Sequence, residues 1–272
     1  MPKRGRTIMP GQWPNGIRRP MSTWILLRGL TRETGHWGDF IDIFRRNVPG
    51  ARVEALDLPG NGTLNRLASP CAVPAMADHC RAALARRGIT PPYNLLAMSL
   101  GAMVAVSWAS TVPREIARCV LINTSLRPFS PFFRRLQPAN YPHLLGLLMP
   151  GMNDRDKEAA ILRMTSRMRP ADESVLQAWT ALRSAHPVTR MNAVRQLCAA
   201  MRYRAPSEPL AAQLLILASR NDALVHPDCS QALADKWRCE IRFHPRAGHD
   251  IPLDDGAWLA GQVTQWLAGP SR

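Results

Sequence analysis

Three side chains have the types that nucleophilic catalysis requires. Ser99 stands in the stretch AMSLG, with a small residue two positions away on either side. A serine hydroxyl attacks an acyl carbon only when a base takes its proton, and a carboxylate must orient that base. Further along, RNDALVHP supplies Asp222 and RAGHDIP supplies His249. These three residues are therefore candidates for nucleophile, orienting acid and base.

Each candidate follows a short apolar run that predicts a β-strand: 93–99 for Ser99, 212–219 for Asp222 and 240–245 for His249. After Ser99, a run of small and apolar residues predicts a buried helix that stops at Pro113. Strand, tight turn and helix is the setting that exposes a nucleophilic serine. The alternative is an ordinary serine at the start of a core helix, because the small-x-Ser-x-Gly pattern also occurs by chance.

Strand and helix patterns alternate along most of the chain. Further strands are predicted at 23–30 and 116–125 and within 51–62, where the strand runs into a glycine turn. Helices are predicted at 37–47, 74–88, 228–237 and 256–269. Such alternation predicts an α/β fold with a mostly parallel, doubly wound sheet and helices on both faces. Catalytic groups gather at the carboxyl ends of the strands in such sheets, and the three candidates all follow strands.

The alternation is interrupted by a long helical segment, 126–206, with helices predicted at 153–168, 172–185 and 189–203. We interpret 126–206 as a helical cap on a core made of 21–125 and 207–272. In its last helix Met191, Val194, Cys198 and Met201 form one apolar stripe. Methionines of this kind more often fill a core than contact a substrate.

The first twenty residues carry five basic residues, no acidic one, and several Pro and Gly. We interpret 1–20 as a flexible basic tail, or as a start that truly lies at Met21. The tail lacks the apolar segment of a secretory signal, and no run reaches the ~18 apolar residues of a membrane span. Six cysteines without metal-like or paired spacing favour reduced thiols and a cytoplasmic location.

The net charge of +15 is unevenly placed, because 126–206 holds thirteen basic and five acidic residues. One interpretation is a general bias toward arginine. The other is a cap surface that steers an anionic partner, with Arg163 and Arg167 four apart on one predicted helix. An acyl chain on an acidic acyl carrier, or on coenzyme A, would suit the second interpretation. Nucleic acid is not expected, since no recognised binding motif accompanies the charge.

Five stretches make the chain resemble the α/β-hydrolase superfamily: LLRGLTRETGHW (26–37), LDLPGNG (56–62), LLAMSLG (95–101), SRNDALV (219–225) and AGHDIP (247–252). Within it, the chain looks most similar to small carboxylesterases such as the pimeloyl-carrier-protein methyl ester esterases. The resemblance implies the α/β-hydrolase fold, a helical cap inserted after the sixth core strand, and the order Ser, Asp, His. It implies neither metal nor organic cofactor.

Two backbone N–H groups are candidates for an oxyanion hole. The N–H of Leu100 lies where the helix after Ser99 begins. The resemblance assigns the second donor to Leu30, because the family's usual His-Gly-x reads Arg28-Gly29-Leu30 here. Arg28 departs from the family pattern. It is expected either to pair with a buried acid or to reach an anionic substrate.

Other side chains carry weaker expectations. Trp37 with His36, and Phe129 with Phe132 and Phe133, either line the substrate entrance or simply pack. Asp57 is expected to form a turn. Asp250, Asp254 and Asp255 are expected to be solvated loop acids, because Asp222 already occupies the expected strand end.

The chain is therefore expected to be a serine hydrolase that cleaves a carboxylic ester or thioester through an acyl-enzyme. Other triad activities remain alternatives: lactonase, cofactor-free perhydrolase and carbon–carbon hydrolase. A different class of alternative is a non-catalytic ligand-binding protein built on the same scaffold. The oligomeric state does not follow from the sequence.

Overall fold

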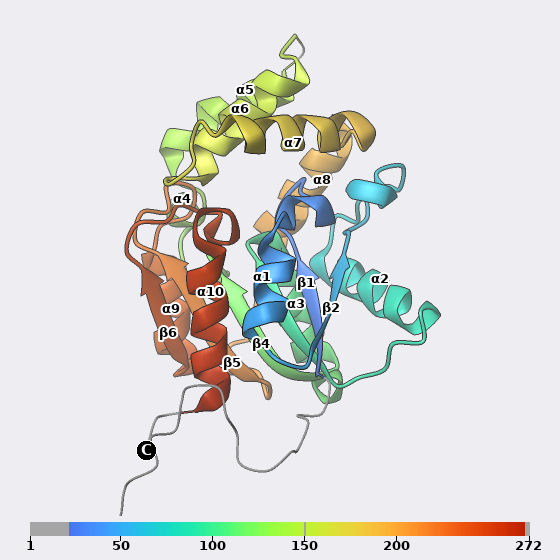
Figure 1. Ribbon diagram of the computed structural model, residues 1–272, viewed down its shortest axis with the longest axis vertical. Coiled ribbons are helices and arrows are strands. Elements are labelled where there is room, and N and C mark those ends of the chain that lie inside the picture. Colours follow the sequence, from blue (N-terminus) through green and yellow to red (C-terminus); the bar gives the residue numbers. More distant parts are fainter. Residues whose placement is uncertain (1–21, 150, 270–272) are drawn as a thin grey trace, which may run out of the picture.

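A computed structural model describes residues 22–149 and 151–269, and the predicted tail, 1–20, lies outside them. Six parallel strands form one sheet in the order β2-β1-β3-β4-β5-β6 (Figure 1). The strands are β1 (Ser22–Leu27), β2 (Ala51–Leu56), β3 (Tyr93–Met98), β4 (Ile116–Ile122), β5 (Gln213–Ser219) and β6 (Glu240–His244). The predicted parallel sheet is confirmed.

Helices cover both faces of the sheet because its central strands are apolar on both sides. In β3, Leu95 and Ala97 pack with one group of helices, while Leu96 and Met98 pack with the other. One face carries α2 (Val73–Arg86), α3 (Leu100–Thr111) and α9 (Asp228–Trp237), and the other carries α1 (Phe40–Asn47) and α10 (Ile251–Ala268). This is the doubly wound arrangement expected from the alternating pattern.

Five α-helices lie between β4 and β5, so in the described residues they follow the fourth strand of the sheet and not the sixth, as had been expected. Figure 1 draws α5, α6 and α7 as a layer beyond the carboxyl ends of the strands. The helices are α4 (Phe132–Arg135), α5 (Tyr141–Leu148), α6 (Asp154–Thr165), α7 (Glu173–Ala185) and α8 (Arg190–Arg202). A small core of its own joins α6 and α7 around Leu162 and Trp179. Side-chain caps from Asn153, Asp172 and Thr189 begin α6, α7 and α8.

The apolar stripe predicted in α8 does not pack inward. Met191 and Met201 are exposed, at 61% and 53% respectively, and Val194 is also exposed. Buried instead are Asn192 and Gln196, on the opposite side of the helix. The prediction was wrong because the loops beneath α8 present polar backbone groups that need partners.

Gln196 shows how the polar side of α8 is used. Its Oε1 accepts a hydrogen bond from the N–H of Thr31 (2.8 Å), and its Nε2 donates to Oδ1 of Asn61 (2.7 Å). Asn192 Oδ1 accepts from the N–H of Ser69 (2.9 Å). Through these contacts α8 is fixed to the loop after β1 and to the loop after β2. Of the helices in the described ranges, none is long and apolar enough to cross a bilayer.

Candidate active site

Ser99 occupies a strained turn between β3 and α3, with φ 54° and ψ −117°. A non-glycine residue in this region is uncommon and persists only where the surroundings enforce it. A Cβ added at Gly101 would lie 2.5 Å from the carbonyl oxygens of Leu27 and Arg28, and one at Gly29 would lie 3.2 Å from the Cβ of Ser99. The small residues around Ser99 are therefore required by close backbone packing.

The two expected oxyanion donors are the backbone N–H groups of Leu30 and Leu100. Leu100 is the first residue of α3, so its N–H has no partner within the helix. Leu30 follows Gly29, whose Cα lies against the Ser99 side chain. Throughout the described ranges, neither N–H donates a hydrogen bond. This is the state that the expected oxyanion hole requires, and the assignment of Leu30 and Leu100 to it remains a prediction.

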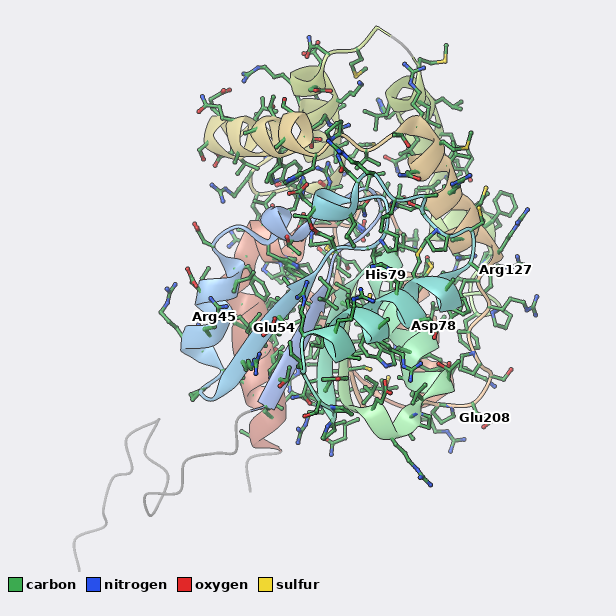
Figure 2. All side chains as sticks on the ribbon, turned by 90° about the vertical axis from the view of Figure 1, so that its right-hand side faces the viewer. Arg45, Glu54, Asp78, His79, Arg127 and Glu208 are labelled. Carbon is green, nitrogen blue, oxygen red and sulfur yellow. The ribbon has the colours of Figure 1, made fainter. Side chains whose placement is uncertain are left out.

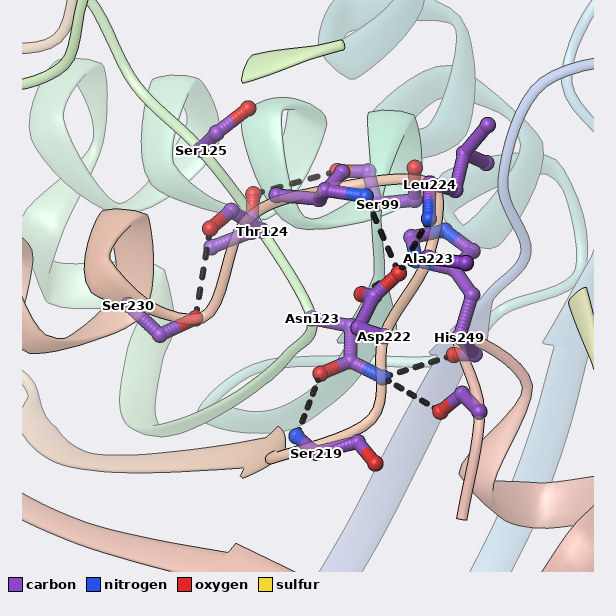
Figure 3. Close-up of polar contacts among 12 residues, drawn as sticks. Ser99, Asn123, Thr124, Ser125, Ser219, Asp222, Ala223, Leu224, Ser230 and His249 are labelled. Atoms are coloured by element: carbon purple, nitrogen blue, oxygen red, sulfur yellow. Dashed lines mark hydrogen bonds and ion pairs between the residues drawn. The ribbon is translucent and has the colours of Figure 1, made fainter. Parts of the chain in front are cut away.

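Asp222 and His249 are in direct contact at the ends of β5 and β6. Nδ1 of His249 lies 2.7 Å from Oδ2 of Asp222, and both residues are buried. The other carboxylate oxygen, Oδ1, accepts hydrogen bonds from the N–H groups of Leu224 (2.8 Å) and Val225 (2.9 Å) (Figure 3). Oδ1 thus fixes the carboxylate to the backbone, and Oδ2 holds the imidazole of His249. This leaves Nε2 as the ring nitrogen for proton transfer.

The third contact of the expected triad is not formed. Within the described residues, no hydrogen bond joins the Ser99 hydroxyl to His249. Catalytic hydrogen bonds are often long in the absence of substrate and tighten in the complex. The pairing of acid and base is therefore observed, whereas the role of Ser99 remains a prediction.

Asn123, which the sequence analysis did not single out, links the three strand ends. It follows β4 with φ 42° and is buried. Its Oδ1 accepts from the N–H of Ser219 (2.8 Å), and its Nδ2 donates to the carbonyl of His249 (2.7 Å) (Figure 3). The preceding residue, Ile122, accepts from the N–H of Ser99 (3.0 Å). A polar residue near the carboxyl end of the predicted strand 116–125 was the available signal.

Arg28 pairs with a buried acid, one of its two expected roles. Its Nη1 lies 3.1 Å from Oδ1 of Asp250, and the guanidinium stands over the ring of Trp37 at 4.9 Å. Asp250 is only 2% exposed, so the prediction of a solvated acid was wrong. Trp37 is buried in the core beside Phe40 (ring centroids 5.5 Å apart) and does not line an entrance.

Asp254 is also buried, contrary to its prediction, because it joins the end of α6 to the loop that carries His249. It accepts from the N–H of Gly248 (2.6 Å), the N–H of Arg167 (3.0 Å) and the hydroxyl of Ser166. Arg167 therefore lies beyond α6, which ends at Thr165, and does not share a helix with Arg163. The predicted helix was too long because Asp254 binds the chain just after that helix ends.

Buried charges surround the loop after β1. Arg32 donates to Glu158 of α6 (2.6 Å), and Arg183 of α7 binds the same carboxylate. Burial lowers the pKa of Arg32, and Glu158 opposes that shift. Burial, with a contribution from Arg32, holds the pKa of His36 well below its usual value. Burial raises the pKa of Glu33, whose Oε2 lies 3.1 Å from Nδ1 of His186.

The remaining candidates make other contacts or are exposed. Phe129 packs on Trp237 of α9 (5.8 Å between ring centroids), which is the packing alternative. Phe133 is exposed and stands edge-on to Phe132. Asp57 accepts from the N–H groups of Thr34 and Thr63, as expected of a turn residue.

Two surface cavities, of about 670 and 450 Å³, are lined by other parts of the fold and include none of the three candidate triad residues. The first lies at the amino ends of β5 and β6, and the second between β2 and α2. Across the ranges 22–149 and 151–269, no three His, Cys, Asp or Glu side chains are grouped as for a metal ion.

Comparisons with known proteins agree with this architecture. The model of the alpha/beta hydrolase family matches residues 24–262, so the chain belongs to that family and is an α/β-hydrolase enzyme. No curated protein sequence matches the chain.

Solved structures with the same fold include esterases. A thermophilic esterase from Thermogutta terrifontis has a TM-score of 0.71 at 19% identity, covering 92% of this chain and 90% of its own. Esterase RhEst1 from Rhodococcus sp. has a TM-score of 0.74 at 17% identity, covering 92% and 91%. A protein of Mycobacterium tuberculosis H37Rv assigned as a non-heme bromoperoxidase has a TM-score of 0.73 at 20% identity, covering 92% and 93%. At these identities the likeness concerns the fold.

Proposed function

We propose that this α/β-hydrolase cleaves a carboxylic ester or thioester through an acyl-enzyme on Ser99. His249 takes the serine proton through Nε2, and Asp222 holds the imidazole and stabilises its charged form. The N–H groups of Leu30 and Leu100 bind the oxyanion of the tetrahedral intermediate. The intermediate collapses to the acyl-enzyme as the alcohol or thiol leaves with the proton from His249. Water then attacks the acyl-enzyme, with His249 again as base, and the carboxylic acid is released from Ser99. The observation that carries the proposal is the buried 2.7 Å contact of His249 with Asp222, next to a serine with the backbone strain of a nucleophile turn.

We further propose that 126–206 acts as a cap. Its helices meet the loop of Leu30 through Gln196 and the loop of His249 through Asp254, so both halves of the proposed site depend on its position. A small ester or thioester is the proposed substrate, and an acyl group on an acidic acyl carrier remains an alternative. Arg163 still fits that alternative as an exposed cation, but it no longer forms a pair with Arg167. The six free cysteines support the proposal of a reducing, cytoplasmic location.

A cofactor-free perhydrolase is the second candidate, because it would use the same three residues and one structural neighbour is assigned as a bromoperoxidase. A lactonase or carbon–carbon hydrolase would also keep the triad. A non-catalytic ligand-binding protein is less well supported. The one feature in its favour was Arg28 in place of histidine, and the ion pair with Asp250 accounts for that arginine.

The test is hydrolysis of short-chain p-nitrophenyl esters by Ser99→Ala, with Ser110→Ala as the matched control. Ser110 lies at the end of α3 and bonds only a local carbonyl. We expect kcat to fall by on the order of 10⁴–10⁶-fold in Ser99→Ala and to stay unchanged in the control. Near-normal turnover by a folded Ser99→Ala protein would refute the assignment.

A further inference from the structure

The outward side of α8 combines exposed apolar side chains with arginines. Met191, Val194 and Met201 form one exposed stripe along the helix. At 100° per residue, Arg190 flanks the stripe on one side and Arg202 on the other. Asn192 and Gln196, on the polar side of α8, bond to loops of the core. Within the described residues, the apolar stripe on the other side packs against no hydrophobic cluster.

A second segment extends the same surface. The chain that enters the cap lies against the end of α8, because Arg127 Nη1 donates to the carbonyl of Met201 (3.1 Å) and Arg135 Nη2 donates to that of Ala200 (2.7 Å). From this segment Phe132 protrudes with 74% of its surface exposed, beside Phe133. We call the combined surface the α8 face: Phe132, Phe133, Met191, Val194 and Met201, with Arg127, Arg190, Arg202 and Arg204.

The charge on the α8 face has one sign. The two segments that form it, 126–135 and 189–206, hold seven arginines and no acidic residue. Arg134 is paired with Asp228, whereas the four arginines of the face are exposed and enter no ion pair in the described ranges. Figure 2 places Arg127 at the margin of the molecule, and Glu208, a nearby acid along the chain, lies lower on that side.

From these observations we propose that the α8 face binds the surface of an anionic lipid bilayer. Arginines beside exposed Phe and Met are the composition of segments that rest in a headgroup layer, with the apolar side chains inserted and the cations on lipid phosphates. A second copy of the chain would bring like charges together. The segment 1–20 carries five basic residues and no acid, so charge opposes its covering the face. Two protruding phenyl rings enter a fluid headgroup layer without a matching pocket, which favours lipid over an acidic protein.

This partner goes beyond the proposed esterase chemistry and does not depend on it. The α8 face lies on the opposite side of the helix from Gln196, the residue that binds the loop of Leu30. Bound in this way, the enzyme would keep the proposed site next to a lipid surface while the core remains in water.

The experiment measures co-sedimentation of the whole protein with vesicles of phosphatidylcholine alone and with vesicles that also contain phosphatidylglycerol. We expect binding to the anionic vesicles only, and weaker binding as salt is raised. Arg202→Glu with Arg204→Glu should weaken it by about tenfold or more, since each basic residue near an anionic surface contributes about fivefold in affinity. The matched control, Arg46→Glu with Arg114→Glu, makes the same change of charge at exposed positions of the core.

Two apolar variants complete the test: Phe132→Ser with Phe133→Ser, and Met191→Gln with Met201→Gln. Each should reduce vesicle binding while its melting curve stays that of the unchanged protein. Three outcomes would overturn the proposal. The first is no binding to either kind of vesicle. The second is a loss of affinity in the control pair as large as that in Arg202→Glu with Arg204→Glu. The third is binding of an acyl carrier protein, tested as the acidic protein probe, through these arginines while the vesicles do not bind. Ester hydrolysis in solution, measured alongside, separates failure of this proposal from failure of the proposed chemistry.

Discussion

At the scale of single residues, the type of an acidic side chain near His249 did not reveal its partners. Asp222, Asp250 and Asp254 are all buried acids near His249, and the sequence singled out only Asp222. The order of strands and candidates was enough for that choice. The partners of the other two, Arg28 and the chain after α6, come from distant segments, so no local pattern announces them.

His36 gives a prediction about pH. Its pKa in the folded protein is well below that of an exposed histidine, because it is buried near Arg32. Below the unfolded pKa of about 6.5, His36 is protonated in the unfolded chain but stays neutral in the folded protein. The free energy of unfolding is therefore unaffected by this group above about pH 6.5 and decreases as the pH falls below that value. This group alone contributes a slope of up to about 1.4 kcal/mol per pH unit.

The measurement is urea unfolding of the unchanged protein and of His36→Gln at pH 7.5 and pH 5.5. Glutamine keeps an acceptor for the N–H of Glu33, which His36 binds through Nδ1. We expect the variant to lose less stability between the two pH values than the unchanged protein does. Equal losses in the two proteins would contradict the assignment of a buried, neutral His36.

At the scale of elements, the sequence located the strands and helices but not always the side they present. All six strands were predicted within a few residues, because apolar runs with glycine or polar stops are strong signals. The orientation of α8 was missed. Its apolar stripe has a clear period, but burial was decided by hydrogen bonds that Asn192 and Gln196 accept from loop N–H groups 123 and 165 residues away in the chain.

The crossing of β1 and α3 beside Ser99 gives a prediction about stability. A methyl group at Gly101 would meet two backbone carbonyls at 2.5 Å, and backbone cannot move aside as a side chain can. Gly101→Ala should therefore lower the free energy of unfolding by about 2–3 kcal/mol or more. Gly261→Ala in α10 is the control, because an added Cβ there meets nothing within 4 Å and should stabilise the helix by about 0.5–1 kcal/mol. Urea unfolding compares them, and equal effects would contradict the close packing.

At the scale of the whole molecule, the sheet order brings the candidate site together. β3, β4, β5 and β6 are consecutive neighbours, so the segments after them meet at one edge and Asn123 can bond to two of them. The sequence predicted that the strand ends would meet, from the α/β alternation alone. It did not predict that the segment 126–206, the proposed cap, would be held to the rest of the fold by α8 and by the end of α6, since both links pair residues from separate parts of the chain.

That residues 1–20 add nothing to the stability of the whole molecule stays a prediction. These residues lack a periodic apolar face, and the family match begins only at residue 24. A protein that begins at Met21 should melt within about 2 °C of the full chain. Differential scanning calorimetry would check this, and a clearly larger drop would mean that the segment contributes to the fold.

The central claim is that Ser99 is the nucleophile, and covalent labelling tests it most directly. The protein is treated with a fluorophosphonate probe, digested, and the modified residue is identified by mass spectrometry. Our account predicts one modified residue, Ser99, with labelling slowed strongly in His249→Gln, because the serine then lacks its base. Modification of another serine, or no modification of a folded and unaltered protein, would contradict the account.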